Sequence, residues 1–465
     1  MRLVLVPQHV TTTSAKIWCG IFGSVNQPPN GSVQSGAHTW PLPATAWQVV
    51  DVAGRLPADA RTIWTQRLTL TSLQPGAAYA LRATVGAATA QARTRTLPRT
   101  LPRALEKPWT LWLGSCFAWY QDQAGLAGLN TRNLPAYYQP DMTIFCGDQV
   151  YLDNPWYEVL PRDPGRLSAR LLDKYVNTWT QGDTSTGFST LLADGATCLL
   201  ADDHEFWNNH PNWSPLLLSR SAAERSEWAA IAASLYQSFQ AASPAPPTAS
   251  MRFSVGPLDV FLADTRFGRE EGDRNFMTPA ALAELQQWLE GGPIDRPGLL
   301  VMGAPLFTEP TNWFSAKFAD RSLANYAQYA PLTESVLQSR RALLLLAGDI
   351  HFGRLAATQL PSGLPFTELI ASPLALVDKS VGGSFVRAPE RFPARAGAQP
   401  RLRVDTIPWA PPEGGLTVDH FVTLGFTQTD QSVNVRATAW AIAQRSPHHP
   451  IQQGTYSITL PRRAP

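Results

Sequence analysis

The stretch Asp141–Asp153, DMTIFCGDQVYLD, decides the fold. It begins as a short apolar run without polar alternation, which is typical of a strand buried on both faces of a sheet. It ends abruptly at Gly147-Asp148, where an acidic side chain follows the strand. In α/β sheets, functional sites gather just beyond the carboxyl ends of such strands. The stretch therefore predicts an α/β fold with Asp148 at a functional strand end.

Three other apolar runs end in the same way, and they read WTLWLGSC (109–116), ATCLLADDH (196–204) and RALLLLAGDIH (341–351). Further buried strands are predicted at 260–266, 299–307 and 367–373. Helical spacing at 226–239 and 279–289 predicts helices between the strands, with Thr278 as N-cap before Pro279. The tail, at 420–428, 432–440 and 455–461, reads as antiparallel strands separated by polar turns.

Residues 1–95 read as an all-β unit. The stretch TTTSAKIWCG (11–20) alternates as a half-buried strand does. The segment LQPGAAY (73–79) resembles the corner between strands E and F of fibronectin type III and related sandwiches, where a tyrosine hydroxyl fixes the corner. We therefore expect an N-terminal β-sandwich at 1–95, a proline-rich linker at 96–108 and a second domain at 109–465.

The bulk composition excludes several classes of protein. The chain has 465 residues, of which 44% are apolar and 16% charged, and a net charge of +2. A charge so near zero, without a long basic run, argues against a nucleic-acid-binding surface. No apolar run reaches the roughly 18 residues of a membrane span. The apolar stretch before Pro7 is too short for a secretory signal, so we expect a cytoplasmic protein, or a periplasmic or secreted one if a leader has been removed.

The strand ends carry side chains that bind metals. Consecutive acids such as Asp202 and Asp203 repel each other unless a cation or an arginine relieves them. His204, beside them, could bind a metal or give a proton to a leaving group. Asp349 and His351 stand at i and i+2, so in an extended segment they would converge on one point.

Two unusual ligand types accompany these acids. Tyr151 ligates only when it loses its proton, which requires a strongly Lewis-acidic ion; otherwise it is a packed tyrosine. Cys116 fits a thiolate ligand better than a nucleophile, because no paired base is signalled nearby. Thiolate, phenolate and carboxylates suit a trivalent transition metal, and a neighbouring all-oxygen shell suits Ca²⁺ or Mn²⁺.

Other polar residues leave alternatives open. Arg266, in Asp264-Thr265-Arg266, could clamp a phosphoryl oxygen or form a structural ion pair. Cys146 and Cys198 lie inside apolar runs and are expected to be inert buried thiols. Five histidines are expected to be bystanders in loops or linkers: His9, His38, His210, His448 and His449.

Taken together, the motifs resemble the alkaline phosphatase D (PhoD-like) family of the calcineurin-like metallophosphoesterase superfamily. The matching segments are GSC (114–116), GDQVYLD (147–153), DDHEFWNN (202–209), ADTRFGR (263–269), LQQWL (285–289), GDIHFG (348–353) and ELIASP (368–373). The resemblance implies an α/β/β/α sandwich of two mixed sheets, preceded by an all-β sandwich of the fibronectin III or immunoglobulin type.

The resemblance also implies a site. Iron(III) would be held by Cys116, Asp148 and Tyr151. Calcium, or Mn²⁺ or another divalent ion in its place, would share Asp148. By position Asp203 takes a ligand role and His204 that of general acid. The remaining implied residues are Asp349 and His351, which complete the metal set, and Asp202 and Asn208, which are either ligands or supports of ligands.

The function implied is a phosphoric ester hydrolase that uses metal-activated water and acts on diesters more readily than on monoesters. Its substrate would be a small or polymeric phosphate ester, selected by loops at 119–140, 154–190 and 309–335. One alternative is a non-catalytic module on an inactive scaffold that binds a glycan or polymer through some of the 16 tryptophans. Another is a cysteine hydrolase that uses Cys116 with His204 or His351.

Overall fold

The computed structural model describes residues 1–122, 124–182, 186–214, 217, 220–242, 250–312, 320–375, 387–394, 401–409 and 415–463. The loop predicted at 243–250 lies outside these ranges except for its last residue. None of the helices within these ranges is long and apolar enough to cross a bilayer.

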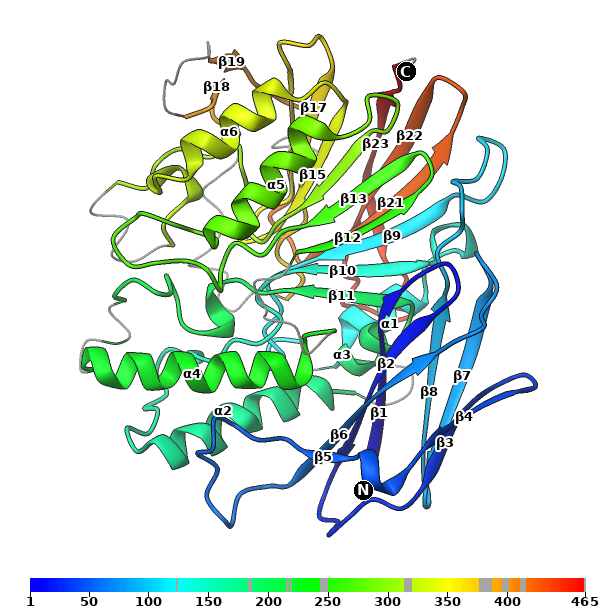
Figure 1. Ribbon diagram of the computed structural model, residues 1–465, viewed down its shortest axis with the longest axis vertical. Helices are drawn as coiled ribbons and strands as arrows, with labels where there is room; N and C mark the ends of the chain where they lie inside the picture. The colour runs from blue at the N-terminus through cyan, green and yellow to red at the C-terminus, as the bar shows by residue number, and fades with distance from the viewer. Residues whose placement is uncertain are drawn as a thin grey trace.

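The N-terminal part consists of two four-stranded antiparallel sheets with the strand orders β1-β2-β6-β5 and β4-β3-β7-β8 (Figure 1). The hydroxyl of Tyr79 accepts a hydrogen bond from the backbone N–H of Gln74 at 2.7 Å, as predicted for the corner. The strands are β1 (Arg2–Val10), β2 (Ala15–Phe22), β3 (Gly31–Ser35), β4 (His38–Leu42), β5 (Gln48–Val49), β6 (Ile63–Leu70), β7 (Ala78–Val85) and β8 (Ala88–Arg95).

The prediction that residues 11–20 form a half-buried strand is wrong in its burial. Strand β2 is buried along nearly its whole length. One face, with Ile17 and Cys19, packs inside the sandwich. The other face carries Trp18, which packs against helices of the second part, and its Nε1 donates to the carbonyl of Ser238 at 2.8 Å. The alternation in the sequence therefore distinguished two buried faces rather than core from solvent.

Two mixed sheets form the second part, as the resemblance implies. The six-stranded sheet has the order β11-β10-β9-β21-β22-β23, and the seven-stranded sheet β12-β13-β14-β15-β17-β16-β20. The first comprises β9 (Trp109–Gly114), β10 (Met142–Cys146), β11 (Ala196–Leu200), β21 (His420–Gln428), β22 (Ser432–Ala441) and β23 (Ile451–Pro461). The second comprises β12 (Met251–Val255), β13 (Leu258–Leu262), β14 (Gly298–Val301), β15 (Leu343–Ala347), β16 (Arg354–Gln359), β17 (Pro365–Ile370) and β20 (Asp405–Thr406).

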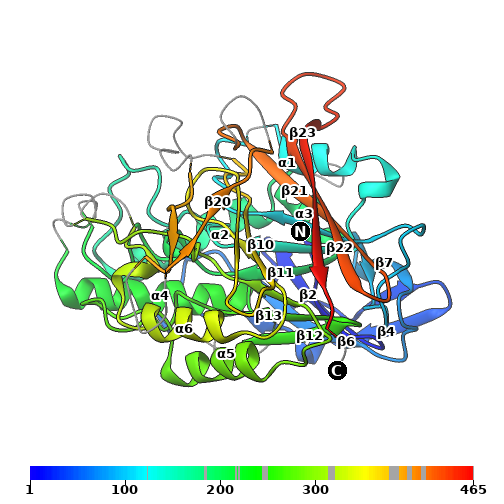
Figure 2. The same ribbon diagram turned by 90° about the horizontal axis from the view of Figure 1, so that it is seen from above.

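The core shows how the layers stack. Leu111 and Ile144 of the first sheet share one apolar cluster with Leu344 of the second, so the two sheets pack face to face. Helices cover the outer faces (Figures 1 and 2). Phe145 packs outward against α2 (Pro164–Trp179), α3 (Phe188–Ala193) and α4 (Ala222–Phe239), near α1 (Leu126–Arg132). Leu345 packs outward against α5 (Pro279–Gly291) and α6 (Tyr329–Gln338).

Thr278 caps α5 as predicted, since its side chain accepts from the backbone N–H of Ala281. Helices α1 and α2, however, lie in segments that were expected to be loops, and α6 begins in the third such segment. Helix α2 begins with Asp163 as N-cap and a proline in its first turn, a start signal that the aromatic residues before it obscured. Short elements complete the described fold: η1 (Ala44–Ala46), η2 (Ala136–Tyr138), η3 (Asp203–Glu205), η6 (Leu323–Asn325), β18 (Arg391–Phe392) and β19 (Leu402–Arg403).

The sandwich lies directly against the second part. Arg93 of β8 forms an ion pair with buried Asp194 at 3.0 Å, and Arg95 forms one with buried Asp141 at 2.9 Å. Both arginines precede the segment 96–108, so the chain is already docked on the second part where the predicted linker begins. The division at 95 and 109 stays a prediction.

Candidate metal centre

Glycines bring the strand ends of the two sheets together. A Cβ on Gly147, which follows β10 with φ +96°, would meet the Cβ of Asp202 at 2.4 Å. A Cβ on Gly348, which follows β15, would meet the hydroxyl of Ser115 at 2.5 Å. Only glycine permits such approaches. Gly147 thus brings the end of β10 against Asp202, and Gly348 brings the end of β15 against Ser115.

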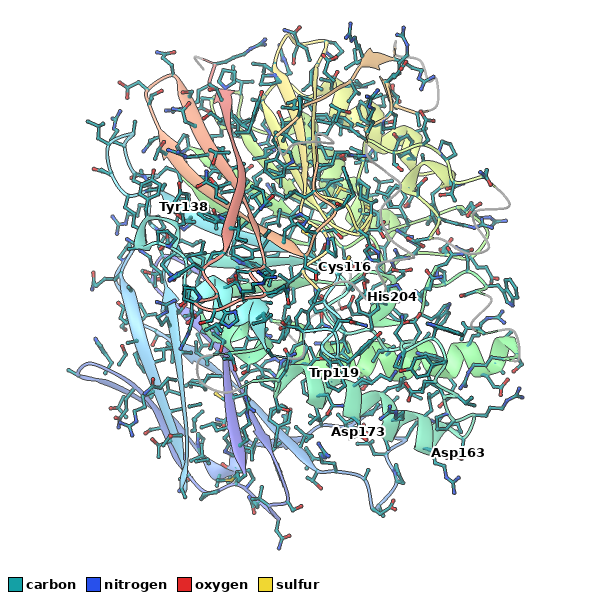
Figure 3. All side chains as sticks on the ribbon, turned by 180° about the vertical axis from the view of Figure 1, so that it is seen from behind. Cys116, Trp119, Tyr138, Asp163, Asp173 and His204 are labelled. Atoms are coloured by element: carbon teal, nitrogen blue, oxygen red, sulfur yellow. The ribbon has the colours of Figure 1, made fainter. Side chains whose placement is uncertain are left out.

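Four predicted site residues occupy the left-handed backbone region. The φ angles are +58° at Cys116, +59° at Asp148, +73° at Asp349 and +51° at His351. Non-glycine residues seldom adopt this region, and such strain collects at functional sites. The backbone therefore turns sharply just after β9, β10 and β15, where these residues follow the strands. Figure 3 labels two residues of the site, Cys116 and His204.

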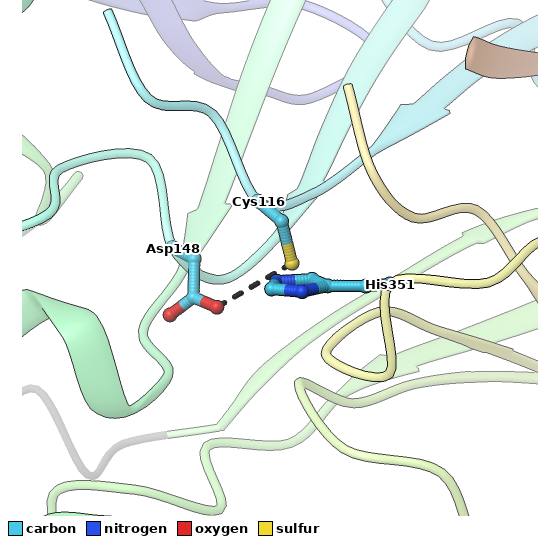
Figure 4. A group of neighbouring side chains, drawn as sticks. All are labelled: Cys116, Asp148 and His351. Carbon is cyan, nitrogen blue, oxygen red and sulfur yellow. Dashed lines mark hydrogen bonds between the residues drawn. The ribbon is translucent and has the colours of Figure 1, made fainter. Parts of the chain in front are cut away.

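The first group of possible ligands combines sulfur, oxygen and nitrogen. Cys116 Sγ, a carboxylate oxygen of Asp148 and a ring nitrogen of His351 lie within 4.8 Å of one another (Figure 4). Cys116 Sγ is 3.4 Å from Asp148 Oδ2 and accepts from the hydroxyl of Ser372 at 3.1 Å. The hydroxyl of Tyr151 lies 3.3 Å from His351 Nε2, so the phenol reaches the same group.

The second group shares Asp148 with the first. Asp148, Asp203 and His204 offer three ligand atoms within 4.8 Å of one another. Asp148 therefore belongs to both groups and can bridge two cations. The other carboxylate oxygen of Asp148, Oδ1, accepts from the backbone N–H of His204 at 3.1 Å, which fixes its orientation.

His204 is held by a residue that the sequence interpretation did not single out. Its Nδ1 lies 2.7 Å from Oδ1 of Asp153, and its ring stacks on Tyr151 at 4.2 Å between centroids. Buried Asp153 also accepts from the backbone N–H of Asn208 at 2.7 Å. The predicted site residue Asn208 thus supports the partner of His204 through its backbone. Asp153 closes the GDQVYLD motif, but its role depends on a contact 51 residues away.

The third group consists of carboxylates alone: Asp202, Asp203 and Asp349. The Oδ2 atom of Asp202 is buried and has no hydrogen-bond partner within the described part of the chain. Asp349 and His351 belong to different groups, and their convergence on one ion stays a prediction. The extended segment that would have paired them is absent, because both residues adopt left-handed backbone angles.

Arg266 is buried and fully engaged. Its Nε and Nη2 donate to Oδ1 of Asp202, its Nη1 to the carbonyl of His210 at 2.7 Å, and both terminal nitrogens to Asp320. These bonds occupy all five guanidinium donors. Asp264, expected beside Arg266, instead accepts from the backbone N–H groups of Arg266 and Phe267. Of the two alternatives, the geometry favours the structural ion pair.

Glu205 organises the loops beneath the centre. Its carboxylate accepts from the backbone N–H groups of Asp148, Gln149, Val150 and Asp202 at 2.7 to 3.2 Å. Burial nevertheless raises the pKa of Glu205 to about 7. This side chain holds the β10 and β11 loops in register. The DDHE motif contained it, but nothing in the sequence separated a loop clamp from a ligand.

The electrostatics of the centre call for cations. Burial, and then the neighbouring acids Asp203 and Asp202, raise the pKa of Asp148 well above its usual value. Burial, and then Asp202, Asp320 and Asp203, likewise raise the pKa of Asp349 well above its usual value. Burial and Asp148 also raise the pKa of the Cys116 thiol. Buried acids that repel one another, with one unpartnered carboxylate oxygen among them, fit a multinuclear metal site.

The neighbouring carboxylates favour the charged form of His204, whereas they oppose the charged forms of the acids and the thiol. Burial lowers the pKa of His204, but the carboxylates of Asp153, Asp203 and Asp148 outweigh burial and hold the pKa well above its usual value. These carboxylates favour the protonated imidazole, and because Nδ1 faces Asp153, Nε2 is the ring nitrogen left to donate. His351 differs, since burial and the neighbouring His204 lower its pKa to about 4. A neutral imidazole suits a metal ligand.

The remaining predicted bystanders are only partly as expected. Cys146 and Cys198 are free and buried, as predicted. His9 and His38 lie in strands β1 and β4 rather than in loops. His210 is buried beside the site, stacked on Phe206 at 3.9 Å, and its carbonyl accepts from Arg266.

Comparisons with known proteins concern the family and the fold. A family described as PhoD-like phosphatase matches residues 111–381. The solved structure of PhoD aligns with a TM-score of 0.66 and 12% identity, covering 98% of this chain and 90% of that chain. A purple acid phosphatase, PPD1, from yellow lupin (Lupinus luteus) seeds aligns with a TM-score of 0.57 and 11% identity, covering 98% and 74%. No curated protein sequence matches the chain. At these identities the structural likeness concerns the fold.

Proposed function

This chain belongs to the PhoD-like phosphatase family, and on that premise we propose that it hydrolyses phosphate esters, diesters more readily than monoesters, at a centre of iron(III) and calcium. Family and structural neighbours together make it a metal-dependent phosphoesterase. The particular ions and the diester preference are our proposal.

One observation carries the proposal: Asp148 belongs to two ligand groups of different chemistry. On one side lie a thiol, an imidazole and the nearby phenol of Tyr151, a set that suits iron(III). On the other side lie Asp203 and His204, with Asp202 and Asp349 grouped around Asp203, a set rich in oxygen that suits calcium, or manganese in its place. When bound, the two ions would lower the pKa of a water molecule and neutralise charge that develops around phosphorus.

The side chains around the centre provide proton transfer and orientation. Asp153 accepts from Nδ1 of His204, which leaves Nε2 to donate a proton to the departing alcohol oxygen. The stacked ring of Tyr151 restricts rotation of the same imidazole. Arg266 orients Asp202 through two donors and leaves Oδ2 of Asp202 free for a cation. We assign Arg266 to this positioning role.

The two alternatives from the sequence receive less support. In residues 1–95, Trp18 and Trp47 are buried and Trp40 and Trp64 half-buried, so no exposed tryptophan offers a glycan platform there. Burial and Asp148 raise the pKa of Cys116, whereas a nucleophilic cysteine needs a lowered one.

The test is release of p-nitrophenol from bis(p-nitrophenyl) phosphate at alkaline pH, with metal content measured by elemental analysis. The wild-type protein should lose activity on chelation and regain it with iron and calcium. Cys116→Ala should lose iron and activity together. Cys198→Ala, which also removes a buried thiol but lies outside the three ligand groups, should keep both. Full iron and activity in Cys116→Ala would contradict the iron assignment.

A further inference from the structure

The loop that leaves the metal centre after Asp153 exposes apolar side chains. Trp156 is 65% exposed, Tyr157 72% and Val159 95%. Of the ten exposed large hydrophobic residues in the described part of the chain, these three fall within four consecutive positions. Scattered exposed apolar residues are ordinary, but a cluster marks a binding surface.

The loop is held rigidly while its rings face solvent. Lys174 of α2, itself buried, donates to the carbonyl of Asn154 and to Glu158. The Nη2 atom of Arg220 donates to the carbonyls of Leu160 and Pro161 at 2.9 and 2.7 Å. Both ends of the loop are therefore anchored by positively charged side chains from other parts of the chain, Lys174 and Arg220. The exposed rings are presented by a fixed backbone, which lowers the entropy cost of binding a ligand.

The loop also starts beside the centre, at the residue that holds His204 through Nδ1. Asp153, which holds His204, lies three residues before Trp156, so their Cα atoms are at most about 11 Å apart. Figure 3 labels His204 and also Asp163, the N-cap of α2, which follows the loop in the chain. The exposed rings therefore lie close in the chain to the residue that holds His204, where the organic group of an ester bound at the centre could meet them.

We propose that Trp156 and Tyr157 form a subsite that stacks on the planar aromatic or heteroaromatic group of a phosphate ester. The inference rests on the proposed function and names the class of its substrate. The two rings stand edge to face, with centroids 5.9 Å apart at 79°, and form a corner for a third ring. Two aromatic side chains offer about 300 Å² of surface. A stable protein interface needs about 800 Å² per partner, so the pair fits one planar group better than a protein.

The test compares two stable probes that share one head group, phenylphosphonate and methylphosphonate. Their dissociation constants are measured by calorimetry on the metal-loaded protein. Wild type should bind the phenyl probe about ten-fold more tightly than the methyl probe, because the free energy of one aromatic ring contact corresponds to about this ratio of dissociation constants. Trp156→Ala and Tyr157→Ala should each reduce this ratio severalfold, and Val159→Ala, on the same loop, should preserve it.

The outcomes separate the inference from the function on which it rests. Equal affinity of wild type for the two probes, or an unchanged ratio in both aromatic variants, would overturn the subsite. If bis(p-nitrophenyl) phosphate is still hydrolysed in a metal-dependent way, the proposed function survives that result. A ratio that falls in Val159→Ala as much as in Trp156→Ala would assign the effect to the apolar loop in general and also overturn the stacking subsite.

Discussion

Replacing Arg266 by methionine should destabilise the protein rather than only weaken substrate binding. Methionine has a similar length but no donor, so Asp202 loses the partner of its Oδ1 atom while its Oδ2 already has none. Asp320 keeps Arg269, at 2.9 Å. The change therefore leaves one buried carboxylate without compensation. Such a loss costs about 3–5 kcal/mol of unfolding free energy.

The assay is denaturant unfolding of the chelated protein, followed by tryptophan fluorescence. Removing the metals excludes a contribution from cations at Asp202. The matched control is Arg103→Met, because Arg103 and its partner Asp430 are exposed (63% and 80%) and such pairs are worth under about 1 kcal/mol. Adding Asp202→Asn to Arg266→Met should recover much of the loss, since the uncompensated charge is then gone.

A different pattern would refute this reasoning. If Arg266→Met unfolded within about 1 kcal/mol of wild type, the buried pair would not be a structural requirement. If the same variant lost ester hydrolysis and phosphonate binding while keeping its metals, the clamp on a phosphoryl oxygen would be the correct role for Arg266.

Three further predictions follow from individual contacts. Asp153→Asn should lower kcat/KM about 10²–10⁴-fold for esters with alkyl leaving groups, because their departing oxygen needs a proton from His204. For p-nitrophenyl esters, whose leaving group needs no general acid, the loss should be under about ten-fold. Equal losses for both kinds of ester would exclude the proton-donor role of His204. Ser372→Ala removes a hydroxyl that donates a hydrogen bond to Cys116 Sγ, so the affinity for the proposed iron should fall about 10- to 100-fold. The sulfur-to-iron charge-transfer absorption should move to longer wavelength. An unchanged spectrum and affinity would contradict the contact. Burial lowers the pKa of His420 from 6.5 to about 4, so between these pH values the folded state binds fewer protons than the unfolded state. The contribution of neutral His420 to the unfolding free energy is therefore complete above pH 6.5 and is lost as the pH falls towards 4, by roughly 3 kcal/mol. His420→Gln should flatten that acid limb of the unfolding free energy, and a parallel curve would count against it.

Much of the layered fold followed from local patterns. The runs that became β9, β10, β11 and β15 lacked polar alternation, and strands buried on both faces require that composition. For strand β2 the predicted burial was wrong, because one of its alternating faces packs inside the sandwich and the other packs against helices instead of facing solvent. Whether a second face meets water or protein is a property of the assembled chain.

The sequence by itself determined the ligand types and their position at strand ends, because both depend on residue order: GSC, GDQVY, DDHE and GDIH each place metal-binding atoms directly after an apolar run. Only the tertiary structure decided which of these atoms meet. Asp148 joins two ligand groups, Asp349 and His351 fall into different groups, and Asp153 holds His204. Left-handed turns at Asp148, Asp349 and His351, and a contact between residues 51 positions apart, produce this arrangement, and sequence spacing encodes neither. Likewise, Arg266 could be seen as engaged only once Asp202 and Asp320, 64 and 54 residues away, were placed around its guanidinium.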